Sequence, residues 1–348
     1  MRRYSSLLLV FLFSCQPDDS DTIQFEDVNF TEVTTLLSAE SHDQIGQPAD
    51  LLYSNSGLVL YDYSAQSVFL FDDKGDEILR FGREGDGPGE FRYIAGLWKQ
   101  NNQYIAYDRN SGKLIHYNND GVFVKETSLD FEGMALSMSL LPENEIYVPS
   151  NGSEGSLIRK VNLQNSSNVL FGESLLSDDY DFNFDRSQQE ILSGKIPPNM
   201  INRLILGSNE SGLFSFQQAT AVLQKYSHSQ ELLWEINLSD IRASEGIFDR
   251  FIEINQSFAD RGMRNMYMIQ HASDIAVTDS GVFLLMNTIP DHPSTVVWVS
   301  NQGERVVSAY LPEGDVFNPD LITVSNDGTE IYLGSRMEGV VNRLTWPI

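Results

Sequence analysis

Short runs of apolar and β-branched residues recur along the chain, and each run is separated from the next by a turn rich in Gly, Asn, Asp or Ser. The first four runs are residues 50–54, 58–61, 67–71 and 77–81. Runs of this length between turn-forming residues predict β-strands rather than helices. Four antiparallel strands joined by tight turns form one blade of a β-propeller.

The same four-strand unit returns about 45 residues later. Tyr61-Asp62 is repeated as Tyr107-Asp108, and a turn at residues 73–75 is repeated at 119–121. Repeats of this length in an all-β pattern predict propeller blades. We therefore predict an all-β, six-bladed β-propeller with four-stranded antiparallel blades, whose copies span residues 50–81, 95–127, 136–171, 203–236, 274–310 and 321–346.

The sixth copy has only three strands, because no fourth run follows residues 340–346. A blade left in this state would expose an unpaired strand edge. The extended segment at residues 23–37 belongs to no copy. We predict that part of it pairs beside residues 340–345 as the outermost strand of the sixth blade, so that the N-terminal strand closes the ring.

The apolar period changes between the fourth and fifth copies. Ile247, Phe251, Ile254 and Phe258 fall on one face of an amphipathic helix, and Gly262 is placed to end it. We expect one helical insertion at about residues 240–270, packed on the rim of the propeller or serving as a lid. The polar stretch at residues 177–199 is expected to be irregular.

The first residues indicate export. Arg2 and Arg3 precede an apolar run at 7–13, which is too short to span a membrane. The following Leu-Phe-Ser-Cys ending at Cys15 resembles a bacterial lipoprotein box. The resemblance implies a signal peptide at residues 1–14 and lipidation of Cys15 as the membrane anchor; the alternative is an ordinary cleaved signal.

The segment behind Cys15 is acidic and contains a proline, which is typical of an unfolded tether. We assign residues 15–21 to this tether and residues 22–348 to the propeller. The tether also looks like the acidic export signals of some lipoproteins. This similarity implies the outer membrane, and favours the cell surface over the periplasmic face.

The net charge and the cysteine content argue against some classes of partner and of site. The chain has 23 Lys and Arg against 49 Asp and Glu, a net charge of −26, which repels phosphate backbones and argues against nucleic acid. Cys15 is the single cysteine, so the propeller has neither a disulfide nor a thiolate metal ligand.

The link between the first two copies, residues 82–91, is rich in glycine and ends in Phe91. Glycines allow the backbone angles that this crossing requires, and Phe91 can anchor the joint in the core. The stretch resembles the Gly-x-Gly-Pro-Gly-Glu-Phe joint of NHL-type propellers. The chain is similar in this region, residues 50–126, to six-bladed propeller lipoproteins.

Polar residues end the second strand of each copy, and Asp62 and Asp108 are the acidic members of this column. In lactonase-type propellers, carboxylates and amides near the channel hold calcium, which prefers six to eight oxygen ligands. The other interpretation is that these aspartates close turns by accepting backbone N–H groups. We favour the second and expect no cofactor, with calcium as the alternative.

Three further residues are candidates for a ligand site. Trp98 lies on a predicted inner strand, where its ring could stack on a ligand, and His271 and His292 could approach an axial pocket. None of these residues completes a catalytic motif. The sequence therefore favours a non-enzymatic scaffold that binds an unidentified protein, peptide or glycan, and the alternative is a metal-assisted hydrolase, lactonase or lyase acting at the channel.

Overall fold

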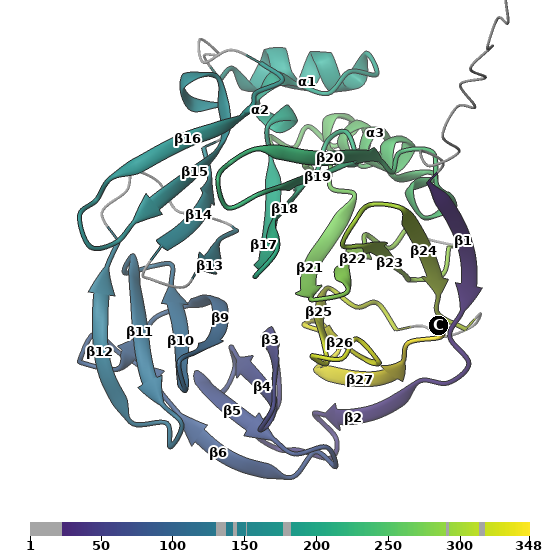
Figure 1. The fold of residues 1–348 in the computed structure, drawn as a ribbon. Helices are drawn as coiled ribbons and strands as arrows, with labels where there is room; N and C mark the ends of the chain where they lie inside the picture. The colour runs from purple at the N-terminus through teal and green to yellow at the C-terminus, as the bar shows by residue number, and fades with distance from the viewer. Residues whose placement is uncertain are drawn as a thin grey trace, which may run out of the picture.

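The computed structural model describes residues 23–129, 137–141, 145–150, 152–176, 182–289, 292–312 and 317–348. These residues form six antiparallel sheets arranged radially around a common centre (Figure 1). The prediction of an all-β, six-bladed propeller is confirmed. No helix within the described ranges is long and apolar enough to cross a membrane.

Each blade follows the chain from an inner to an outer strand. Blades one and two comprise β3 (Pro48–Ser54), β4 (Gly57–Asp62), β5 (Ser67–Phe71) and β6 (Glu77–Phe81), then β9 (Ile94–Gln100), β10 (Gln103–Asp108), β11 (Lys113–Asn118) and β12 (Phe123–Ser128). Blades three and four comprise β13 (Ser139–Leu141), β14 (Glu145–Pro149), β15 (Ser156–Asn162) and β16 (Asn168–Glu173), then β17 (Leu204–Asn209), β18 (Gly212–Gln217), β19 (Val222–Tyr226) and β20 (Leu232–Asn237). Blade five comprises β21 (Ala272–Thr278), β22 (Gly281–Met286), β23 (Thr295–Ser300) and β24 (Arg305–Tyr310), and blade six contains β25 (Leu321–Val324), β26 (Glu330–Ser335) and β27 (Val340–Thr345).

The core consists of the interfaces between neighbouring blades. Every residue of β4 and β5 is buried, because both faces of the sheet are covered by adjacent blades, whereas the outer strand β6 is largely exposed. At the first joint, Phe91 is fully buried and its ring contacts Tyr61 edge-on, with centroids 5.5 Å apart. Phe91 thus anchors the glycine-rich joint, which also contains the short strands β7 (Arg83–Glu84) and β8 (Glu90–Phe91).

The N-terminal segment closes the ring as predicted. β2 (Thr34–Ser38) pairs antiparallel with β27 as the fourth strand of blade six, and Leu37 on this strand is fully buried. The segment also makes a second strand pairing that the sequence did not indicate. β1 (Gln24–Asn29) pairs in parallel with β24 and adds a fifth strand to blade five (Figure 1).

Helices occur in two inter-blade links. α3 (Ile247–Asp260) lies in the expected insertion, with Ile247 and Phe251 buried. The expectation of an irregular stretch at 177–199 is wrong where the structure describes it. α1 (Phe184–Leu192) and α2 (Pro198–Ile201) form there, and Ile191 of α1 packs in one apolar cluster with Phe251 of α3. The sequence signal was weak because α1 has few apolar residues.

The connections divide between the two faces of the disc. One face, here called the turn face, carries the turns that join each inner strand to the second strand. The opposite face, called the linker face, carries the links from one blade to the next, including α1, α2 and α3. All inner strands begin at the linker face and end at the turn face, so a residue's position along its strand gives its depth in the channel.

Candidate functional site

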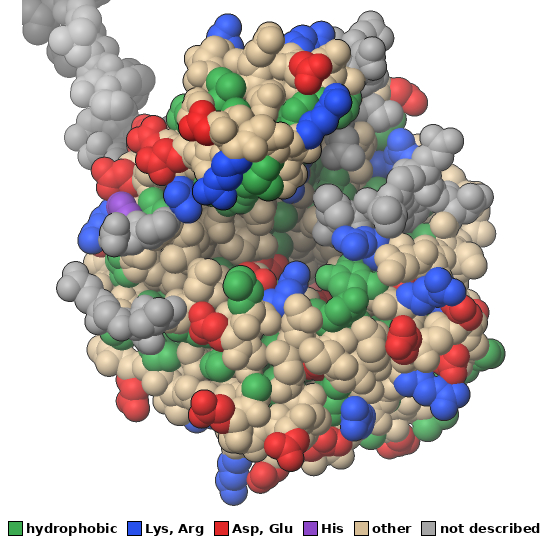
Figure 2. Space-filling model, turned by 180° about the vertical axis from the view of Figure 1, so that it is seen from behind, with side chains coloured by type: hydrophobic (Ala, Val, Ile, Leu, Met, Phe, Trp, Pro, Cys, Tyr) green, Lys and Arg blue, Asp and Glu red, His purple; other side chains and the backbone are tan. Residues whose placement is uncertain are grey.

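A central cavity of about 720 Å³ lies between the inner strands. β3, β9, β13, β17, β21 and β25 all contribute to its lining. Figure 2 shows the molecule hollowed near its centre. This volume falls within the range of ligand pockets, about 300–1,000 Å³. The channel is therefore large enough for a small ligand.

Hydroxyl and amide groups line the end of the channel at the turn face. The polar neutral residues there are Ser54, Asn55, Ser56, Gln100, Asn101, Asn102, Asn119 and Asn326. Asn326 Nδ2 donates a hydrogen bond of 2.6 Å to Asn55 Oδ1, which links blades six and one. The Lys99 ammonium donates to Asn119 Oδ1 at 2.5 Å and lies 3.3 Å from the Tyr104 ring centroid. This rim can donate and accept hydrogen bonds with a polar ligand.

Two carboxyl groups occupy the other end, toward the linker face. Asp50 in β3 and Asp274 in β21 are both the third residue of their inner strand, and each lies at an irregularity in the pairing with the second strand. The equivalent position of blade two is Gly96, where an added Cβ would lie 2.4 Å from the Trp98 ring. Blades one and five thus place a carboxyl group where blade two places an indole.

Asp50 and Asp274 have similar surroundings. Oδ1 of each accepts the N–H of the next residue, Leu51 or Ile275, at 2.8 Å. Asp274 Oδ2 also accepts the Ile322 N–H from blade six at 2.8 Å. Asp50 Oδ2 is buried and accepts no hydrogen bond of normal geometry among the described residues, although the nearby Leu97 N–H lowers the pKa of this carboxyl group. By hydrogen-bond geometry, Asp50 is thus the less satisfied of the two.

Burial raises the pKa of both carboxyl groups, because a charge deep in the ring is poorly solvated. The pKa of Asp50 rises to about 8, first through burial and then through the negative charge of Asp274. The pKa of Asp274 rises to about 7, chiefly through burial. Arg336 lowers the pKa of both groups but does not offset these effects. Near neutral pH, the pair therefore exchanges protons readily.

Arg336 is held at the linker face by other groups. Its Nε lies 3.6 Å from Asp320 Oδ2, and its Nη2 donates to the Ala49 carbonyl at 3.3 Å. One guanidinium thus faces three carboxyl groups, Asp50, Asp274 and Asp320. The linker-face end of the channel is acidic.

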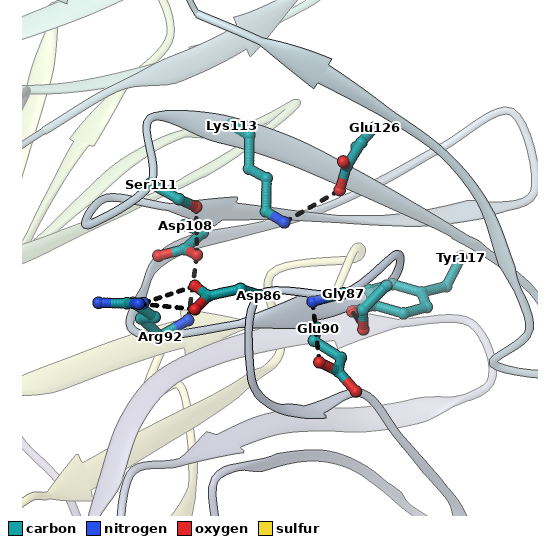
Figure 3. A network of polar contacts seen from close by, with 10 residues as sticks. Asp86, Gly87, Glu90, Arg92, Asp108, Ser111, Lys113, Tyr117 and Glu126 are labelled. Atoms are coloured by element: carbon teal, nitrogen blue, oxygen red, sulfur yellow. Dashed lines mark hydrogen bonds and ion pairs between the residues drawn. The ribbon is translucent and has the colours of Figure 1, made fainter.

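Asp62 and Asp108 lie in a different environment. Both are fully buried at the ends of second strands, outside the cavity lining. Asp62 accepts the N–H groups of Gly46, Gln47 and Ala65 at 2.9, 2.7 and 2.8 Å. Asp108 accepts the Arg92 N–H at 3.0 Å and the Ser111 hydroxyl (Figure 3). It also accepts the N–H groups of Tyr93 and Asn110, both at 3.1 Å. Each carboxylate holds a turn to the adjoining link.

The structure does not bring the two candidate histidines together. His271 is buried, and its Nδ1 lies 2.8 Å from the Gln218 carbonyl; burial lowers its pKa. His292 is exposed and lines a small surface recess with Arg242 and Tyr310. Neither residue lines the central cavity.

Trp98 lies on the inner strand β9 and lines the channel, as its position in the sequence suggested. Its ring also packs against a core cluster shared by blades two and three. Its role in ligand binding stays a prediction. Cys15 and the tether lie outside the described residues.

No group of three or more His, Cys, Asp or Glu side chains within the described ranges could hold a metal ion. The calcium alternative for Asp62 and Asp108 has no geometric support in the described residues.

Asp50 and Asp274 were not among the candidates from the sequence, although a signal for them exists. Each precedes an apolar residue at the start of an inner strand, as Asp50-Leu51 and Asp274-Ile275. An aspartate inside a buried strand is unusual unless it is paired. Their convergence could not be inferred, because the two aspartates are 224 residues apart in the sequence (274 − 50) and belong to non-consecutive blades.

Comparisons with known proteins agree with the fold. Residues 18–191 match the model of a family described as 6-bladed beta-propeller, DUF5128. No curated protein sequence matches the chain significantly. A protein of Bacteroides fragilis NCTC 9343 that has been assigned as exported is similar in structure, with 11% identity, coverage of 93% of this chain and 99% of that one, and a TM-score of 0.58.

Two other solved structures are similar to a lesser degree. A protein of Bacteroides thetaiotaomicron VPI-5482 has 11% identity, coverage of 93% and 74%, and a TM-score of 0.51. The virginiamycin B lyase of Staphylococcus aureus has 13% identity, coverage of 90% and 99%, and a TM-score of 0.50. At these identities the likeness concerns the fold alone.

Proposed function

Since the chain belongs to the DUF5128 family of 6-bladed β-propellers, we propose that it is a binding protein of the cell envelope whose central channel holds a small polar ligand. One observation carries this proposal: a channel of about 720 Å³, lined by hydroxyl and amide groups at one end and by carboxyl groups at the other. A pocket with a few convergent polar groups is the usual form of a ligand site.

The ring supports this function because hydrogen bonds join its inner strands from blade to blade. The lining groups are held by hydrogen bonds between blades, such as Tyr53 N–H to Thr323 Oγ1 at 2.9 Å and Asp274 to the Ile322 N–H. A ligand that enters such a site meets groups that are already in place, which lowers the entropic cost of binding.

A screen of oligosaccharides and short peptides by thermal shift, followed by calorimetry, tests the proposal. Trp98→Ala should weaken binding of any hit, because the indole lines the channel. Trp234→Ala is the matched control, since that ring is also partly buried but lies on the outer strand β20, with Nε1 bonded to the Asn301 carbonyl. If no polar ligand binds, or if both variants weaken binding equally, the channel is not the site.

A second candidate function is acid–base catalysis in the same channel. Asp50 and Asp274 favour it, because groups with a pKa near neutrality are effective proton donors and acceptors. A ligand identified by the screen should then be chemically altered on incubation with the wild-type protein and remain intact with Asp50→Asn. Recovery of unchanged ligand from both proteins would leave binding as the function.

We further propose that the protein is exported and anchored through lipid on Cys15, with the cell surface favoured over the periplasmic face. The lipoprotein-like residues that end at Cys15 support the anchor. Labelling of cells with a fatty-acid analogue should mark the wild-type protein but not Cys15→Ala. Protease added to intact cells tests the exposed face, and complete protection would contradict surface display.

A further inference from the structure

The charges that line the channel are separated by sign. Among the described residues of the lining, three are charged: Asp50, Asp274 and Lys99. The two aspartates lie toward the linker face, and Lys99 is the sixth residue of β9, close to the turn face. A ligand in the channel therefore meets carboxyl groups at one end and an ammonium group at the other.

Too little positive charge lies at the carboxyl end of the channel to keep the two aspartates ionised, and a bound cation would favour their ionised form. Arg336 is the nearby cation, but it is shared with Asp320 and the Ala49 carbonyl. Asp50 Oδ2 is buried and has no hydrogen-bond partner of normal geometry in the described part of the chain; the nearby Leu97 N–H lowers the pKa of this carboxyl group without offsetting its burial. A buried carboxyl oxygen without a partner is costly, and a ligand group that donates hydrogen bonds would remove this cost.

The basic end shows the opposite deficiency. Lys99 Nζ contacts an amide oxygen of Asn119 and the face of Tyr104, and makes no ion pair within the described residues. Burial lowers the pKa of this ammonium. An anionic group at the turn-face end of the channel would supply the missing partner.

The separation of the two ends can be read from the strand register. Leu51 and Leu97 occupy equivalent positions, because each pairs with the residue two before Asp62 or Asp108. Lys99 is therefore equivalent to Tyr53, three residues beyond Asp50. Three residues of strand span about 10 Å. An extended chain of three residues has about the same length.

Building on the proposed function, we propose that the ligand is a short peptide of about three residues, bound extended along the channel axis. Its N-terminal ammonium lies at Asp50 and Asp274, and its C-terminal carboxylate lies at Lys99. The amide and hydroxyl groups of the lining form hydrogen bonds with the peptide backbone. Two oppositely charged ends fix the direction of the peptide, since the reversed peptide would set like charges together.

Calorimetry with tri-alanine tests this proposal, using three forms of the peptide: unmodified, N-acetylated and C-amidated. The unmodified form should bind the full-length protein, and each modification should weaken binding roughly tenfold or more, because each removes one charge pair. In the Asp50→Asn/Asp274→Asn variant, acetylation should have little further effect. In Lys99→Met, amidation should have little further effect.

Matched controls change the same residue types at exposed positions away from the channel. These are Asp76→Asn with Asp260→Asn at the end of α3, and Lys125→Met on the outer strand β12. Both controls should retain the wild-type preference for the unmodified peptide. Circular dichroism and thermal melts of every variant verify folding.

The outcomes separate this inference from the proposed function. Equal affinity for all three peptides, or binding of oligosaccharides without peptides, would overturn the peptide proposal and leave the channel as a binding site. Failure of every polar ligand in the screen would contradict both.

Discussion

Two pairs of aspartates, both inside the ring, have opposite surroundings. Asp62 and Asp108 each accept three or four hydrogen bonds from neighbouring N–H and O–H groups. Asp50 and Asp274 accept fewer, lie near each other's charge and have a raised pKa. A carboxylate that accepts several N–H bonds is stable when ionised, whereas a poorly satisfied one tends to hold its proton. The comparison separates carboxylates that hold the fold from those available to a ligand.

The difference also shows that residue type is an incomplete guide to a site. Asp62 and Asp108 form the more conspicuous pattern in the sequence, because they repeat at one position of the blade. Asp62 and Asp108 accept hydrogen bonds from the links and turns next to their own blades, and their role is therefore structural. The pair that lines the channel comes from blades one and five, which are not consecutive in the sequence, so no adjacent repeat indicates it.

The largest expected effect is on stability, from removing a fully satisfied carboxylate. Asp108→Ala removes a fully buried carboxylate and leaves the part-buried N–H groups of Arg92, Tyr93 and Asn110 without their acceptor. We expect the free energy of unfolding to fall by about 3 kcal/mol, because each of the three donors should cost about 1 kcal/mol, the lower end of the range for unsatisfied donors. Urea denaturation followed by fluorescence measures this change.

Asp86→Ala is the control for that prediction. Asp86 forms a bidentate ion pair with Arg92 at 2.6 Å, but both side chains are largely exposed (Figure 3). Such surface pairs contribute little to stability, because water and salt screen the two charges. Similar losses in Asp108→Ala and Asp86→Ala would contradict the structural role assigned to Asp108.

The next effect is on the pH dependence of stability. The folded-state pKa values of Asp50 and Asp274 lie above the ordinary value of 3.8, so between about pH 4 and 8 the folded protein binds protons that the unfolded chain releases. Their contribution to stability is therefore greatest at low pH and is lost as the pH rises through 7 and 8. Asp50→Asn/Asp274→Asn removes this dependence.

We expect the wild-type protein and this double variant to be similarly stable at about pH 3.5, below the ordinary carboxyl pKa of 3.8, and to diverge as the pH rises from 4 to 8. At pH 8 the variant should be more stable by about 2–4 kcal/mol, since one unit of pKa shift corresponds to about 1.4 kcal/mol and water in the channel will reduce the full effect. The quantity to measure is the difference in stability between the wild-type protein and the variant at each pH. The buried His271, whose pKa is lowered, changes stability with pH in the opposite sense, but it is present in both proteins and its contribution cancels. A constant difference from pH 5 to 8 would contradict the raised pKa of the pair.

The smallest expected effect comes from Arg336, which lowers the pKa of both channel carboxyls. Arg336→Gln removes that charge and should displace the pH midpoint of the pair upward, as expected for loss of a nearby opposite charge. Arg343→Gln on β27 is the control, because its guanidinium donates to the Asp73 carbonyl instead. Carboxyl titration by NMR measures both midpoints, and equal displacement would exclude a specific role of Arg336.

The repeating blades could be predicted because their strands are bounded by strong turn residues and repeat at a nearly constant spacing. Closure by residues 34–38 followed from a physical requirement, since blade six lacked one strand. In contrast, β1 pairs on blade five, which already has four strands, so no missing partner indicates it. α1 was missed because its buried positions include Ser187 as well as Ile191, which weakens the apolar period.

The candidate site was less predictable than the fold. Trp98 could be placed at the channel because the inner strand of its blade was recognised. The convergence of Asp50 and Asp274 depends on local irregularities of the inner strands and on the closure of the ring, which brings blade five near blade one. Neither feature is encoded in a short motif.

The parallel strand β1 has a mechanical consequence. Six consecutive residues of β1 pair with β24, and an ion pair between Arg305 and Glu26 at 2.6 Å joins the same strands. A pull on the chain ahead of residue 24, directed along β1, loads this ladder in shear, so many bonds resist together rather than opening one at a time. Phe30, buried against Trp346, holds the chain behind it. Tension must therefore detach β1 before it reaches β2. Thus β1, which is not needed to close the ring, protects the closing strand β2 from force.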